Sequence, residues 1–413
     1  MTANTQRGWL ASVLATAGAA HAGYLALRPR GGTIASIPVA ADEYFSAEEI
    51  ARARRYERPQ RILNQTNTAL SVAALGLMRA RHPAGLRALR PARAAAAGAA
   101  LSLQLAVLSL PLDAVARKRS LDAGLATQSW RGWGADALRI TALGSTFAGT
   151  GAAIVCVLMR RFDERWWLVA GAGSVAVTTL AGFTGPLLLE PIFNDFTPLP
   201  DGELRAGVLD LAQRAGVRLG GVFSVDASRR TSAVNAYVSG LGATRRVVLF
   251  DTLLARFPPA QTRLVVAHEL AHVRHRDVVR GLLFGALVAP FATRAVDRLA
   301  ERIDARGARA DSATLPSLVL ASGVVASLVG LSARQLSRAI ERRADSFALE
   351  LTDDAEAFIA FEQQITRANL ADPQPPRWRS SLLATHPPAL ERIGAAAAYA
   401  AGARPTPRRR PRL

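Results

Sequence analysis

Long apolar stretches are the feature that most constrains how this chain can fold. Seven segments approach the roughly 20 residues that a helix needs to cross a lipid bilayer. Because lipid offers no hydrogen-bond partners to the backbone, such segments fold as helices. They lie at residues 8–28, 62–78, 94–114, 137–159, 166–188, 278–296 and 315–331. The pattern predicts a mainly α-helical integral membrane protein with about seven transmembrane helices.

The predicted spans are not equally clear. The first contains Ala20-His21-Ala22, which is typical of a signal-peptide cleavage site. The apolar run continues past this point to Leu27, so we expect an uncleaved span. The span at 62–78 is the weakest, because three amide side chains lie near one of its ends. Basic residues occur in the loops on both sides of that span, so the charge pattern predicts no orientation.

Composition excludes some classes of protein. The chain has 51 basic and 32 acidic residues, a formal net charge of +19. An excess of arginine suits either nucleic acid or anionic lipid headgroups. We expect no nucleic-acid partner, because no aromatic-plus-basic motif and no zinc-finger spacing is present. The single cysteine, Cys156, excludes an intrachain disulfide and a cysteine metal cluster.

The pattern changes to soluble α+β between the fifth and sixth spans, at 191–277. Apolar residues at helical spacing predict a helix in 201–217. Short strands are predicted at 222–225, 233–239 and 245–250, with a turn at Gly240-Leu241-Gly242. Pro258-Pro259 precedes a predicted helix at 260–275. A second catalytic part is expected at 332–400, and the basic, proline-rich tail at 401–413 is expected to be disordered.

The predicted helix at 260–275 contains His268-Glu269-Leu270-Ala271-His272. Histidines four residues apart lie on one helical face, so both imidazoles can reach a single ion. Two surface histidines on an amphipathic helix would be the alternative explanation. The spacing is rare enough by chance that a zinc site, with one ion per chain, is the better hypothesis.

Zinc at a catalytic site takes three protein ligands and leaves a fourth position for water. One known arrangement has Gly at position 275 and His at position 278, and the residues here are His275 and Val278. A carboxylate from a second helix is the remaining choice, and Glu341 supplies one. Asp345, four residues later on the same face, is predicted to accept a hydrogen bond from a ligating imidazole.

A zinc ion held by His268, His272 and Glu341 would activate a water molecule for attack on a peptide bond. Glu269 points about 100° away from His268 around the helix, and we expect it to act as general base. His386 is predicted to donate a hydrogen bond to the oxyanion. Its alternative role is that of an ordinary residue at a helix start. His275 is expected to be structural or exposed.

Together these motifs resemble the type I CAAX prenyl endopeptidases, which are integral-membrane zinc proteases. The resemblance extends over about 190–395 and includes residues 191–200, residues 235–237, residues 246–254 and the run from His386 to Arg392. It implies a helical membrane barrel around a chamber, with an inserted zincin-like metalloprotease domain of gluzincin type. It also implies that Arg392 contacts substrate. Asn235, Ala236 and Tyr237 would hold an extended peptide by main-chain pairing.

Two other functions stay open. A membrane quality-control protease of the heat-shock type shares the metal motif but usually has fewer spans. A catalytically inactive zinc-containing scaffold is the other, and the intact Glu269 argues against it. We expect a multi-pass protein of a bacterial cell membrane whose partners are the bilayer and a peptide or protein substrate. The sequence does not decide whether that substrate is lipid-modified.

Overall fold

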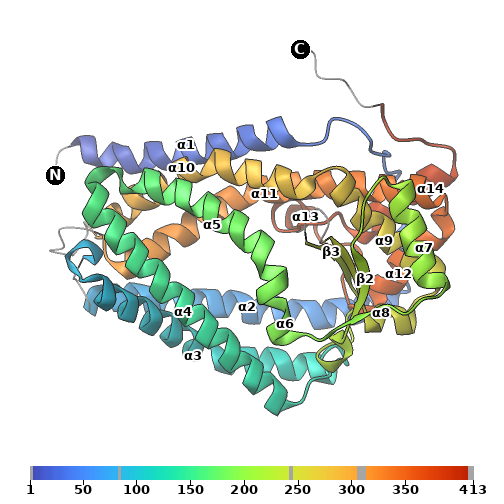
Figure 1. The fold of residues 1–413 in the computed structure, drawn as a ribbon, viewed down its shortest axis with the longest axis horizontal. Helices are drawn as coiled ribbons and strands as arrows, with labels where there is room; N and C mark the ends of the chain where they lie inside the picture. The colour runs from blue at the N-terminus through green and yellow to red at the C-terminus, as the bar shows by residue number, and fades with distance from the viewer. Residues whose placement is uncertain (1–2, 82–84, 241–244, 305–312, 408–413) are drawn as a thin grey trace.

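The computed structural model describes residues 3–81, 85–240, 245–304 and 313–407. Long helices form most of the molecule, and a small sheet with several shorter helices gathers at one end (Figure 1). The long helices are α1 (Ala3–Leu27), α2 (Ala47–Arg81), α3 (Pro91–Asp122), α4 (Trp130–Phe162), α5 (Trp166–Leu188), α10 (Asp277–Asp304) and α11 (Leu315–Thr352). The predicted α-rich membrane fold with an inserted mixed α+β part is therefore confirmed.

Five stretches among the described residues are long and apolar enough to cross a membrane. They are Gly8–Leu27, Pro91–Asp122, Trp130–Gly182, Asp277–Asp304 and Leu315–Thr352. The third runs through both α4 and α5, which a short 3-10 helix, η3 (Asp163–Arg165), joins. Six of the seven predicted spans lie wholly or mostly in these stretches. The seventh, 62–78, lies in α2, which is one continuous helix but is not among the five.

The outer faces of the long helices are apolar and exposed, as lipid contact requires. Leu138 is 71% exposed, and Val177 is 64% exposed. Contact between the helices depends on small residues. A Cβ at Gly98 of α3 would lie 2.6 Å from the backbone oxygen of Ala148, and one at Gly149 of α4 would lie 2.8 Å from that of Ala95. Without side chains at these glycines, α3 and α4 can pack backbone against backbone.

The sheet has four strands in the order β1-β2-β4-β3. The three predicted strands are present as β2 (Gly221–Val225), β3 (Ala236–Ser239) and β4 (Arg246–Phe250). β1 (Phe196–Pro198) was not predicted, because three residues ending in proline give no alternating pattern. β2 is parallel to β4, while β3 pairs with β4 in the antiparallel sense and forms an edge. Leu241 and Gly242 of the predicted turn lie outside the described residues.

Shorter helices cover the sheet and hold the site. They are α6 (Glu190–Phe193), α7 (Glu203–Arg214), α8 (Asp251–Arg256), α9 (Pro259–Arg274), α12 (Ala355–Ala368), α13 (Arg377–Leu382) and α14 (Ala389–Ala400). Val208 of α7, Val247 of β4 and Leu270 of α9 belong to one fully buried cluster. Leu264 of α9 packs in a second cluster with Leu349 of α11 and Ala396 of α14. Helix α9 is thus fixed by core contacts on two sides.

The tail that was predicted to be disordered is described as far as residue 407. The backbone of Thr406 accepts a hydrogen bond from Gly32 and donates one to Thr33, at 2.8 and 3.0 Å. These bonds join the end of the chain to the extended segment that follows α1. Residues 408–413 lie outside the described residues.

Candidate metal centre

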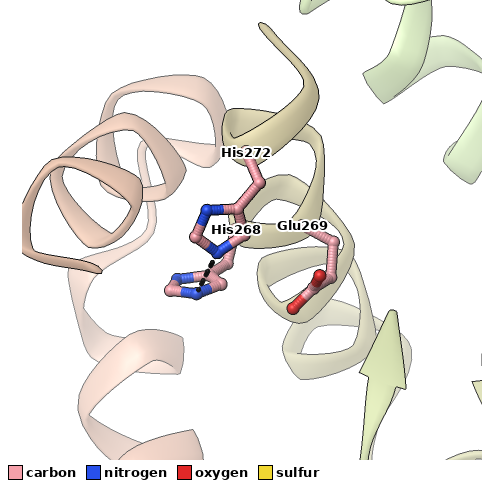
Figure 2. A group of neighbouring side chains, drawn as sticks. All are labelled: His268, Glu269 and His272. Carbon is pink, nitrogen blue, oxygen red and sulfur yellow. Dashed lines mark hydrogen bonds between the residues drawn. The ribbon is translucent and has the colours of Figure 1, made fainter. Parts of the chain in front are cut away.

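Helix α9 presents the histidine motif on its half-buried side. Pro259 occupies the first turn, where the missing N–H costs nothing, and an apolar run follows it. Val266, Ala267, Leu270 and Ala271 of that run are completely buried. The remaining face carries His268 and His272, whose imidazoles lie together with their Nε2 atoms 3.3 Å apart (Figure 2).

The carboxylate of Glu341 forms a triangle with these two rings, with a different oxygen toward each ring. Its Oε2 lies 3.1 Å from Nε2 of His268, and its Oε1 lies 3.7 Å from Nε2 of His272. With bonds of about 2.0–2.1 Å, a tetrahedral zinc ion separates its ligand atoms by about 3.4 Å. Oε2 of Glu341 is also buried and accepts no hydrogen bond. The spacing and the unsatisfied oxygen both suit a bound zinc ion.

The electric field at this point favours a cation. Burial opposes a positive charge on His268, but the nearby carboxylates of Asp345 and Glu341 outweigh burial and raise the pKa of His268 to about 10. Two carboxylates therefore converge on one imidazole in a place that is shielded from water. Such a place is stable when a positive charge, proton or metal, occupies it.

Glu269 lies beside the triangle rather than in it. Its carboxylate comes within 4.8 Å of the ring nitrogens. Figure 2 shows it leaving α9 on the other side from the two rings, toward the neighbouring strand. There it accepts a hydrogen bond from the backbone N–H of Val238 in β3, and burial raises the pKa of Glu269 above its usual range. A base in this place could face both a water molecule and β3, the strand that is predicted to pair with the substrate.

Each histidine has its own carboxylate behind it. The predicted partner, Asp345, lies with Oδ1 2.9 Å from Nδ1 of His268. The sequence analysis missed Asp277, whose Oδ2 lies 3.2 Å from Nδ1 of His272. Asp277 is the first residue of α10, and it reaches His272 because Arg276 adopts a left-handed conformation, with φ of 55°. An acid five residues after the second histidine, just past the helix end, was the available signal.

His386 reaches the triangle from the loop before α14. Its Nε2 lies 3.4 Å from Oε2 of Glu341, and its Nδ1 lies 3.0 Å from the hydroxyl of Thr385. The side chain is 62% exposed and lines a cavity of about 640 Å³ together with His268 and Glu269. His275, in contrast, points away and packs its ring on Phe347, 5.4 Å between centroids.

The predicted substrate strand borders the same cavity. Asn235 is exposed and lines it. Ala236 is buried in the core of the sheet, and the hydroxyl of Tyr237 donates to Glu190 at 3.1 Å. The side chains of these last two residues are therefore already engaged within the protein. β3 is an edge strand of the sheet, so a further strand could pair with its outer side.

Arg392 lies in the wall of the cavity, but carboxylates already bind its guanidinium. Nε and Nη2 donate to Asp345 at 2.9 and 2.6 Å, and Nη1 lies 2.6 Å from Oε1 of Glu362. Its predicted substrate contact stays a prediction. Glu362 was not singled out from the sequence, because a lone glutamate on a helix carries no pattern.

The fold and the site define a membrane-integrated metalloprotease. The model of peptidase family M48 matches residues 198–400. Uncharacterized metalloprotease YhfN of Bacillus subtilis is 31% identical over 301 residues, which cover 71% of this chain and 70% of that protein. The chain belongs to peptidase family M48.

The resemblance to CAAX prenyl endopeptidases is confirmed as well. CAAX prenyl protease 1 of Saccharomyces cerevisiae is 36% identical over 143 residues, which cover 33% of this chain and 31% of that protein. The crystal structure of S. mikatae Ste24p superposes with a TM-score of 0.73 and 21% identity over 95% of this chain and 98% of that one. The two proteins share a fold along nearly their whole lengths.

Proposed function

We propose that this protein is a zinc-dependent endopeptidase that hydrolyses peptide bonds with Glu269 as general base. The observation that carries the proposal is the convergence of His268, His272 and Glu341, whose nitrogen–nitrogen and nitrogen–oxygen distances of 3.1 to 3.7 Å lie around the value of about 3.4 Å for tetrahedral zinc. When bound, the ion lowers the pKa of a water molecule toward about 7 and polarises the scissile carbonyl. Every other task falls to side chains of this chain.

The side chains divide the proton and charge work. The Glu269 carboxylate takes a proton from the attacking water and later delivers it to the leaving amine. Nε2 of His386, at the mouth of the cavity, donates a hydrogen bond to the oxyanion that develops on the carbonyl. The outer edge of β3, at 235–237, aligns the extended substrate by backbone pairing beside Glu269.

The proposed substrate is a peptide or protein segment, with or without a lipid modification, that reaches the site from the membrane. The CAAX prenyl proteases that this chain resembles motivate that part. A fold match over 95% of the chain favours this type over a heat-shock type protease with fewer spans. A bacterial cell membrane is the proposed location, since YhfN is a bacterial relative.

The Glu269→Ala variant tests the mechanism directly. We expect purified protein in detergent to carry about one zinc per chain in both parent and variant, since Glu269 is not a ligand. Peptide cleavage should fall by about 10²–10⁴-fold, the usual contribution of a general base. Zinc content by elemental analysis and cleavage of a fluorogenic peptide library measure the two quantities.

Two further variants frame that result. His268→Ala should lose both zinc and cleavage, because it removes a ligand. Glu356→Gln, on the exposed side of α12, should change neither. A Glu269→Ala protein that cleaves as fast as the parent would rule out the proposed base. If the Glu269→Ala variant is inactive as expected, mass spectrometry of the membrane peptides that accumulate with it would identify the substrate.

A further inference from the structure

A row of buried charges leads from the metal centre to helix α12. Asp345 binds His268, Arg392 binds Asp345 through two nitrogens, and the third nitrogen lies 2.6 Å from Glu362. The side chains of Asp345 and Glu362 are each 3% exposed. Four elements contribute one residue each: α9, α11, α14 and α12. The row is therefore largely shielded from water, and its four residues come from four separate segments of the sequence.

Glu362 occupies a position where an apolar residue would cost less. It lies on the buried face of α12 with Phe358 and Phe361. A buried carboxylate loses its hydration and is tolerated only when it is paired. Its pairing with Arg392 therefore explains how the Glu362 carboxylate can be buried.

The chemistry of the row gives Glu362 a task. A guanidinium that binds both oxygens of Asp345 draws charge from the carboxylate that must accept a hydrogen bond from His268. A second carboxylate on the same guanidinium offsets that pull. Asp345 then keeps both its orientation and its charge toward the imidazole, which makes His268 a better metal ligand.

We propose that Glu362 is a positioning residue of the metal centre, acting through Arg392 and Asp345 on His268. It touches no metal ligand, so its effect is transmitted rather than direct. The inference rests on the proposed zinc site and adds a residue that the histidine and glutamate motifs do not contain.

A pH signature separates this role from a structural one. Burial raises the pKa of Glu362 to about 7, against the charge of Arg392. The charged groups that face it are Arg392 of α14, Asp345 of α11 and His268 of α9. Above this pKa Glu362 is ionised, and below it the carboxyl is neutral, as glutamine always is. Glu362→Gln should therefore differ from the parent at high pH and resemble it at low pH.

The experiment measures zinc affinity by competition with a chelator, using the full chain in detergent. At about pH 8 we expect Glu362→Gln to bind zinc about tenfold more weakly, the lower end for residues behind metal ligands. At about pH 6 the ratio of the two affinities should approach one.

Two controls make the result specific. Glu356→Gln, the same change at an exposed position of the same helix, should leave zinc affinity unchanged at both pH values. In an Arg392→Gln background, Glu362→Gln should add no further loss, because the connection to Asp345 is already broken.

Three outcomes would overturn the proposal: parental affinity at high pH, an equal loss at both pH values, or an undiminished loss in the Arg392→Gln background. If Glu362→Gln does not fold, Glu362→Asp takes its place. Because aspartate keeps an ionisable group, the ratio of the zinc affinities of the Glu362→Asp and Arg392→Gln proteins should change with pH. A ratio that does not change with pH would contradict the proposal. A parent protein that binds no zinc would instead overturn the proposed function.

Discussion

At the scale of single residues, the proposed metal centre depends on the residues that contact the two histidines as much as on the proposed ligands themselves. Asp345 and Asp277 hold the two histidines from different helices, and each is itself held by arginine. A ring with its Nδ1–H fixed on a carboxylate presents Nε2 to the ion in one orientation. The geometry of the triangle thus depends on residues that never touch a metal.

Asp277→Asn tests the partner that sequence analysis missed. We expect zinc affinity to fall by about 10–100-fold, because His272 loses the charge that orients and polarises it. Chelator competition with purified protein measures the affinity. Asp210→Asn, at an exposed position of α7, is the control and should have no effect. Unchanged affinity in Asp277→Asn would mean that His272 is oriented by other contacts.

At the scale of elements, α11 combines two tasks in one helix. Its 38 residues extend about 57 Å at 1.5 Å per residue, which exceeds the roughly 30 Å of a bilayer core. The apolar first half packs among the membrane helices, and the second half carries Glu341 and Asp345. A predicted boundary at 331/332 falls inside this helix, so the membrane part and the catalytic part share it without a joint.

Close contact between α3 and α4 gives the first prediction at this scale. Gly149→Ala should lower the thermal stability of the purified protein, because the new Cβ would lie 2.8 Å from the backbone of Ala95. Overpacking of this kind costs about 1–3 kcal/mol. The control is Gly151→Ala, two residues along α4, where a Cβ meets nothing within 4 Å. Equal melting temperatures for both variants would contradict the packing argument.

The start of α2 gives the second prediction at the scale of elements. Ser46 and Glu49 cap each other's backbone N–H groups, and Glu49 also binds Arg367 of α12 at 2.7 Å. The N–H of Ser46 and the charge of Arg367 lower the pKa of Glu49 below its usual 4.5. Its stabilising effect is therefore present above about pH 4.5 and is lost as pH falls through the lowered pKa.

We accordingly expect Glu49→Ala to cost about 0.5–1 kcal/mol of stability near neutral pH, a usual value for a helix cap. The cost should shrink as the pH is lowered below 4.5. Thermal melts of the variant and parent across this range measure it, with the exposed Glu48→Ala as control. A cost that does not change with pH would exclude the charge of Glu49 as its source.

At the scale of the whole molecule, the metal centre connects distant parts of the chain. His268 and His272 come from α9, Glu341 comes from α11, and His386 comes from the loop before α14. An ion held by the proposed ligands His268, His272 and Glu341 would bind the folded state far better than the unfolded one. Metal binding should therefore stabilise the entire fold.

Chelation measures that coupling. Free zinc at about 100 times its dissociation constant adds about 2.7 kcal/mol, so a chelator should lower the melting temperature and added zinc should restore it. Glu341→Gln should show a much smaller shift, since it weakens one ligand. The exposed Glu356→Gln should behave as the parent. A melting temperature that does not respond to zinc would contradict a closed ligand set.

The sequence by itself determined the helical membrane fold and the histidine motif, because both depend on local patterns. Twenty apolar residues have one stable structure in lipid, and two histidines four residues apart share a helical face whatever surrounds them. Glu341 could be proposed because the ligand count demanded a carboxylate. Glu362 and β1 carried no comparable pattern, and Asp277 carried only its place just past the end of the histidine helix.

Only the tertiary structure decided which side chains meet. Glu362 joins Arg392 because α12 packs against α14, and Asp277 reaches His272 because one residue turns the chain between α9 and α10. Such contacts depend on the packing of helices far apart in sequence, and buried charges have free energies that depend on every neighbour. Local periodicity contains neither quantity, so the proposed ligands could be predicted from the sequence and the residues that support them could not.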